Sequence, residues 1–267
     1  MNESNQNLSS KVLEELFADT LFKSPAVSIQ SDDKVRESAT LLSHYLESFT
    51  DSLVITNGDR PIGLIGGKEI LDGLLKKPTF DFFENVAVKQ LMDEKITIVS
   101  KNTKLSELIK KWQETRRAFA ILSNPYSGYS AISARKILEI AIKYGTSLMV
   151  SDIPKKKIIT FSDDFSIKKI INLMFENKTR KLILEGTSEF ISDRIIIEKI
   201  VRDLNYLHDV SDFLNMPSDT FKLEKAKTIS DKLTIQDASK LMYAMTSPYL
   251  IVNDQVLSPW DVVQSLQ

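Results

Sequence analysis

The 267-residue chain contains no cysteine and only two histidines. The lack of cysteine excludes disulfides, thiolate metal sites and a cysteine nucleophile. His44 and His208 have no neighbours at ligand spacing, so no metal site is predicted. No apolar run approaches the roughly 20 residues that cross a bilayer, which predicts a chain without membrane spans. A net charge of −1 gives no reason to expect nucleic acid or a membrane surface as a partner.

The composition that remains is that of a globular protein with a core, at 42% hydrophobic and 27% charged residues. Residues 1–10 are polar and lack the apolar centre of a signal peptide, so we expect a disordered N-terminal lead-in. No phosphate-cradling loop, Ser/His/Asp set or metal motif is recognisable. These features predict a soluble, cytoplasmic protein that is not an enzyme.

One local pattern recurs along the chain and is clearest at Gln255–Val263. An apolar pair is followed by Ser258, Pro259 and Asp261, which are favoured at a helix cap, its first position and its third position. The same arrangement occurs three more times, roughly every 60–65 residues, which indicates an internal repeat. The place of Asp261 is taken in the earlier copies by Glu69, Lys136 and Ile195.

Each copy is preceded by a strand and a helix of its own. In the third copy, Ile159 and Phe161 alternate with polar residues, Ser162 and Asp163 supply cap chemistry, and apolar residues then recur at three-to-four spacing from Ile167. A β-rich run and a turn lead into the segment described above. Each repeat is therefore predicted to be a β-α-β-β-α unit of an α+β protein. A unit this small buries little surface alone, so we expect the units to pair.

The pattern resembles the cystathionine β-synthase (CBS) domain over about residues 11–267. The residues that carry the resemblance most specifically are 190–194 (FISDR) and 256–261 (VLSPWD), while the leading glycine of the family pattern is present only as Gly63. The resemblance implies four CBS motifs paired into two Bateman modules, 11–146 and 147–267, joined near Tyr144–Leu148. Such modules associate into a disc, which could close within one chain or between two chains of a homodimer.

The resemblance also implies an adenosine-type ligand, such as AMP, ADP or ATP, in a cleft between paired motifs. A carboxylate at a helix start can accept hydrogen bonds from both ribose hydroxyls, and the exposed N–H groups there favour phosphate. Only Asp261 keeps the family's aspartate, so Ser258 and Asp261 form the first candidate site. The matching positions of the partner motif are Ser151, Ile158 and Arg180, of which Arg180 would meet a phosphate.

The first module offers weaker candidates. Glu69 keeps the charge on a longer arm, behind two glycines that are expected to form only a turn. Ser133 with Lys136 could serve an anionic ligand that lacks a free ribose. Arg116 and Arg117 stand where the family often has basic residues facing phosphate, but a solvated pair before a strand is the preferred interpretation.

Two functions remain open at this point. The chain is expected to be a stand-alone regulatory protein that binds a nucleotide in an inter-motif cleft and signals to an unidentified protein target. The alternative is a ligand-independent scaffold whose clefts have degenerated, as Lys136 and Ile195 suggest. Neither function calls for a metal ion.

Overall fold

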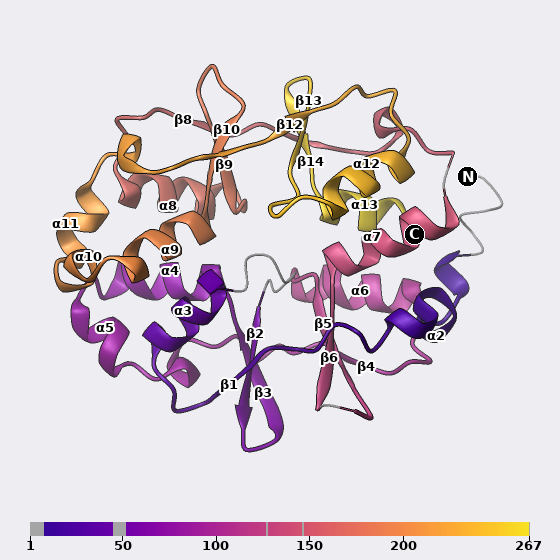
Figure 1. The fold of residues 1–267 in the computed structure, drawn as a ribbon, viewed down its shortest axis with the longest axis horizontal. Coiled ribbons are helices and arrows are strands. Elements are labelled where there is room, and N and C mark those ends of the chain that lie inside the picture. Colours follow the sequence, from indigo (N-terminus) through magenta and orange to yellow (C-terminus); the bar gives the residue numbers. More distant parts are fainter. Residues whose placement is uncertain (1–7, 45–51, 127, 146, 267) are drawn as a thin grey trace.

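The structure is a computed structural model that describes residues 8–44, 52–126, 128–145 and 147–266 (Figure 1). Residues 1–7 of the expected lead-in, and Thr146 at the expected module junction, lie outside the described residues. Residues 8–10 are helical, and Leu8 is buried in the core. The predicted disorder therefore does not extend to residue 10, because Leu8 gains more from burial than its ordering costs.

Four small mixed sheets, one for each repeat, confirm the predicted α+β class (Figure 1). In every sheet the first strand of the repeat runs parallel to the second, which pairs antiparallel with the third. The first two repeats comprise β1 (Ser28–Gln30), α3 (Val35–His44), β2 (Leu53–Asn57), β3 (Arg60–Ile65) and α4 (Gly67–Lys76), then β4 (Ile98–Val99), α6 (Leu105–Thr115), β5 (Phe119–Ser123), β6 (Tyr129–Ser133) and α7 (Ala134–Tyr144). The last two comprise β8 (Thr160–Phe161), α8 (Ile167–Glu176), β9 (Lys181–Leu184), β10 (Glu189–Ser192) and α9 (Asp193–Arg202), then β12 (Lys227–Thr228), α12 (Ile235–Tyr243), β13 (Leu250–Val252), β14 (Gln255–Leu257) and α13 (Pro259–Ser265).

Short α-helices precede the first, second and fourth repeats. These are α2 (Leu13–Phe17), α5 (Phe80–Asn85), α10 (Leu204–His208) and α11 (Val210–Asn215). Helix α2 lies against the second repeat, where the backbone of Lys11 and Leu13 bonds to that of Leu105 and Thr103. The N-terminal segment therefore completes a distant part of the first half of the chain.

The two motifs of the second half exchange strands. Strand β7 (Lys156–Lys157) precedes the third repeat but pairs with β14 of the fourth, and β11 (Glu224–Lys225) precedes the fourth but pairs with β10 of the third. In the first half the same exchange is reduced to single bridges, Pro25 with Ser130 and Leu64 with Asp93. Lys156 and Lys157 in β7 therefore extend the sheet of the neighbouring motif.

The two halves pack on each other through helices within the one chain (Figure 1). Helix α7 packs against α12 and α13, and α9 packs against α3 and α4. One core cluster joins the second repeat to the fourth, and another joins the first to the third. Burial of a side chain such as Trp112 or Ile137 contributes roughly 1.5–3 kcal/mol to the stability of the fold. The disc, left open by the sequence, closes within this chain.

Candidate functional site

In each repeat a helix follows the third strand. These helices are α4, α7, α9 and α13, and the residues that cap their N-terminal ends differ. Ser133 and Ser192 accept hydrogen bonds from the backbone N–H groups of Lys136 at 3.4 Å and Ile195 at 3.3 Å. Ile195 is 8% exposed and belongs to the core between the first and third repeats. The third repeat therefore offers an apolar group at the position where a ribose acceptor would stand.

Asp261 is held at the start of α13 by Ser258. The backbone N–H and the hydroxyl of Ser258 both donate to Oδ2 of Asp261, at 2.8 and 2.7 Å. Burial raises the pKa of Asp261 above its usual value, and the hydrogen bonds from Ser258 and the charge of Lys156 oppose that shift. Burial therefore disfavours the charged form of Asp261, and the hydrogen bonds from Ser258 and the charge of Lys156 offset only part of this penalty.

Tyr249 lies near this carboxylate, and Lys181 lies over the Tyr249 ring. Tyr249 is 6% exposed, and its pKa is raised first by burial and second by the charge of Asp261. The ammonium of Lys181 lies 4.8 Å from the ring centre of Tyr249 and 5.0 Å from that of Phe190. Sequence reasoning missed Tyr249 and Lys181, although both stand beside strands that it predicted.

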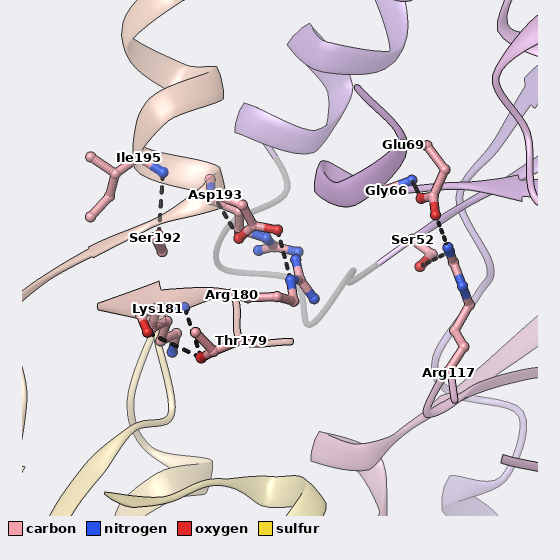
Figure 2. Close-up of polar contacts among 11 residues, drawn as sticks. Ser52, Gly66, Glu69, Arg117, Thr179, Arg180, Lys181, Ser192, Asp193 and Ile195 are labelled. Carbon is pink, nitrogen blue, oxygen red and sulfur yellow. Dashed lines mark hydrogen bonds and ion pairs between the residues drawn. The ribbon is translucent and has the colours of Figure 1, made fainter. Parts of the chain in front are cut away.

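The remaining residues predicted for this site have other partners. Ile158 packs against the hydrophobic cluster that contains Tyr249. Ser151 is exposed, and its hydroxyl donates to Asp152 at 3.1 Å. Arg180 donates from Nε to Asp193 at 2.7 Å (Figure 2). Among the described residues, no hydrogen bond joins Ser151 or Arg180 to Asp261.

Glu69, by contrast, is fully engaged by the protein (Figure 2). Its Oε2 accepts from the backbone of Gly66 at 2.9 Å, and its Oε1 is paired with Arg117, whose guanidinium also donates to Ser52 at 3.1 Å. The side chains of Glu69 and Arg117 are 8% and 15% exposed. The preferred interpretation of a solvated arginine pair is wrong for Arg117, because it spans the two motifs of the first module.

Lys136 is buried at the start of α7, with 7% of its surface exposed. Its Nζ donates to the carbonyl of Thr20 and to Oε1 of Glu139, both at 2.9 Å. Glu139 also accepts from the hydroxyl of Thr20 at 2.8 Å and from that of Tyr243, in the second module, at 3.0 Å. Burial and the Glu139 carboxylate raise the pKa of Tyr243.

Ser133 and Lys136 line a cleft of about 460 Å³. It lies between the lead-in to the first repeat, the second repeat and α12. Its lining comprises Thr20, Lys23, Ser24, Pro25, Val27, Ser52, Phe119, Ala131, Ser133, Arg135, Lys136, Glu139 and Tyr243. The volume lies in the range of small-molecule sites, roughly 300–1,000 Å³.

No group of three or more His, Asp or Glu side chains among the described residues is placed to hold a metal ion. No helix in the described ranges is both long enough and apolar enough to cross a membrane.

Comparison with solved structures identifies the fold. The chain is similar to a protein from Methanocaldococcus jannaschii described as a proposed archaeal homologue of γ-AMPK, with a TM-score of 0.80 and 15% identity over 96% of this chain and 100% of that one. It is also similar to an uncharacterised conserved protein from Pyrococcus horikoshii, with a TM-score of 0.57 and 12% identity over 94% and 99% of the two chains. A CBS-domain protein from Agrobacterium tumefaciens matches half of the chain at 13% identity and a TM-score of 0.42. No family model and no curated protein matches the sequence.

Proposed function

From the fold of this chain, which is that of a CBS-domain protein with four motifs in two Bateman modules, we propose that it is a regulatory protein that binds an adenosine-type nucleotide. The proposed site is the start of α13, at Ser258 and Asp261 in the second module. Nucleotide binding there would alter the contact of the disc with a protein partner, and no catalysis is part of this proposal.

The observation that carries the proposal is the unequal use of the four equivalent helix starts. In the first repeat, both carboxylate oxygens of Glu69 are already bonded to Arg117 and to the backbone of Gly66. At the equivalent position the third repeat has Ile195 and the second repeat has a lysine. Both hydrogen bonds from Ser258 reach Oδ2 of Asp261, and within the described residues no side chain donates to Oδ1. A ribose diol would supply the hydrogen bonds that a desolvated carboxylate favours.

The surroundings of Asp261 suit the rest of the ligand. Lys156 lies close enough to Asp261 for its positive charge to act on the carboxylate. Tyr249 and Phe190 are 6% and 0% exposed, so both rings belong to the core. Attraction of a phosphate by an ammonium group is chemically suitable for AMP, ADP or ATP.

The first experiment is a melting-temperature screen with AMP, ADP, ATP and adenosine. A ligand at one hundred times its dissociation constant, bound only to the folded state, adds about 2.7 kcal/mol of stability. The shift should disappear in Asp261→Asn, which keeps the shape of the side chain. Asp254→Asn is the matched control, because Asp254 is an exposed carboxylate in the preceding turn.

If a nucleotide raises the melting temperature equally in both variants, the binding site does not include the Asp261 carboxylate. The absence of any shift at millimolar ligand would favour the second candidate function, a ligand-independent scaffold. The observation that favours a scaffold is the internal pairing of charges at Glu69 and Lys136, which leaves those helix starts balanced without a ligand.

A further inference from the structure

We propose that Arg135 is a positioning residue, which links the packing of the first module on the second to the geometry around Asp261. Arg135 acts from α7 through the segment that joins α12 to β13. Its effect on a nucleotide rests on the function proposed above, whereas its effect on the Asp261 carboxyl does not depend on any ligand.

Arg135 holds the end of a helix that belongs to the other module. It is the second residue of α7 and is 7% exposed. Its Nη1 donates to the carbonyl of Thr246 and its Nη2 to that of Tyr243, both at 3.0 Å. Tyr243 is the last residue of α12, so the guanidinium lies at the negative end of the helix dipole and bonds a carbonyl that has no partner within the helix. Because the donors of a guanidinium form a planar fork, this contact fixes direction as well as distance.

A second contact from α7 holds the same end of α12. Glu139 stands four residues after Arg135, and residues at this spacing lie on one face of a helix. Its carboxylate accepts from the hydroxyl of Tyr243 at 3.0 Å. The backbone and the side chain of Tyr243 are therefore both bonded to α7, and α12 cannot slide along α7 without breaking these contacts.

The segment that Arg135 holds is short. Residues 244–249 join the end of α12 to the start of β13. Arg135 bonds this segment at Thr246, and Tyr249, which is 6% exposed, is its last residue. With so few residues between them, a displacement of the end of α12 would be passed on to Tyr249.

Tyr249 in turn adjoins the start of α13. The antiparallel register of β13 and β14 pairs Leu250 with Leu257, so the next position of the two chains brings Tyr249 beside Ser258. Ser258 donates both of its hydrogen bonds to Asp261, and the charge of Asp261 acts on Tyr249. The placement of Tyr249 therefore helps to decide how far the Asp261 carboxyl is shielded from water.

The equivalent positions of the four repeats support a role at the contact between modules. Each is the second residue of its helix, and they are Lys68, Arg135, Arg194 and Trp260. Arg194 on α9 lines a small pocket with Leu42 and Ser43, which lie near the C-terminal end of α3 in the first module. In both α7 and α9 this position therefore faces the end of a helix from the other module, and both helices have arginine there.

The test follows the Asp261 carboxyl by carbon NMR of the full chain with isotope-labelled aspartates, and Asp261→Asn assigns its signal. Arg135→Lys keeps the positive charge and removes the planar fork, so a change in this variant reports geometry. We expect the pKa of Asp261 to be lower in Arg135→Lys than in the unmodified protein, because a loosened segment leaves the carboxyl less buried. Lys68→Ala, at the equivalent exposed position of α4, should leave that pKa unchanged.

The second readout is calorimetric titration with AMP. The affinity should fall about fivefold in Arg135→Lys, which is the lower end of the usual coupling between two sites. It should stay the same in Lys68→Ala, which removes an exposed side chain from a helix of the first module. By reciprocity, AMP bound at Asp261 would strengthen the contact of α7 with α12.

An Asp261 pKa that is equal in Arg135→Lys and the unmodified protein would overturn the inference, and so would equal AMP affinities of these two proteins. If Arg135→Lys does not fold, Tyr243→Phe takes its place, because it removes only the hydroxyl bonded to Glu139. Tyr243→Phe should also lower the pKa of Asp261, by less, and an unchanged pKa would then overturn the inference. Absence of AMP binding by the unmodified protein would contradict the proposed function and leave the pKa comparison decisive, so the two failures are distinguishable.

Discussion

Each module has a carboxylate at the start of a helix that follows a third strand, and the two carboxylates differ in whether the protein supplies a counter-charge. In the first, Arg117 reaches from one motif to the other and pairs with Glu69. In the second, Asp261 has Ser258 as its hydrogen-bond donor and remains partly uncompensated, as the raised pKa of its carboxyl indicates. A buried charge needs a partner of opposite charge or a hydrogen-bond donor. In a protein built of repeats, that partner can come from the protein itself in one repeat and from a ligand in another.

The largest expected effect is the loss of the internal partner. Arg117→Ala should lower the free energy of unfolding by about 3 kcal/mol, because it leaves Glu69 buried without its counter-charge. Urea denaturation measures this change. Arg116→Ala, at an exposed neighbouring position, should stay within about 0.5 kcal/mol.

Equal effects of the two arginine substitutions would show that the ion pair between Arg117 and Glu69 contributes nothing to stability. The proposed difference between the two modules would then be contradicted. Combining Arg117→Ala with Glu69→Gln should recover part of the loss, since the uncompensated charge is then removed.

The second test concerns the close approach of the modules at the start of α4. A methyl group on Gly67 would collide with the carboxylate of Asp193 on α9, which Arg180 holds in place. Gly67→Ala should therefore cost about 1–3 kcal/mol in urea denaturation. Lys68→Ala, on an exposed side chain of the same turn, is the control, and an equal result in both would place Asp193 elsewhere in solution.

A smaller effect is expected at the start of α13, where Ser258 stands at the position that Gly66 has in α4. Ser258→Ala should destabilise by about 1 kcal/mol, whereas Ser258→Gly should cost only a few tenths. Thermal unfolding of the two variants side by side measures the difference. An alanine variant as stable as the glycine variant would mean that Ser258 does not support Asp261.

The smallest effect is a pH dependence with a definite sign. A carboxyl whose folded pKa lies above its unfolded value stabilises the fold when protonated, and this contribution is lost as pH rises through the folded pKa. The unmodified protein should therefore lose stability relative to Asp261→Asn as the pH rises from below the usual carboxyl pKa through the raised pKa of Asp261. Urea midpoints of both proteins across this range provide the measurement, and a difference that does not change with pH would contradict the prediction.

The repeated units were predictable because long apolar periods and cap residues specify them locally. Helix α6 begins at Leu105 and contains Leu108 and Trp112, at the spacing that predicted it. Strands β7 and β11 were not predictable, since Lys156–Lys157 and Glu224–Lys225 have no apolar alternation and pair only through tertiary structure. The sequence also left the closure of the disc open, which depends on contacts between helices far apart in the chain.

The placement of three candidate residues at helix starts was predictable, but the partners of these residues were not. The repeat pattern located Asp261, Glu69 and Lys136 at helix starts, and the structure places all three there. The pairing of Arg117 with Glu69, and the bond from Tyr243 to Glu139, join residues 48 and 104 positions apart. No local signal distinguishes such an arginine or tyrosine from an exposed one.

The exchange of β7 and β11 also limits how such a chain can lose or gain parts in evolution. Strand β14 is bordered by β13 on one side and by β7 on the other, and β10 lies between β9 and β11. A deletion that removed one motif of the pair, with its leading segment, would uncover a strand edge that can associate with other chains. In the second half, each motif therefore protects a strand edge of the other, and the two are expected to be kept together.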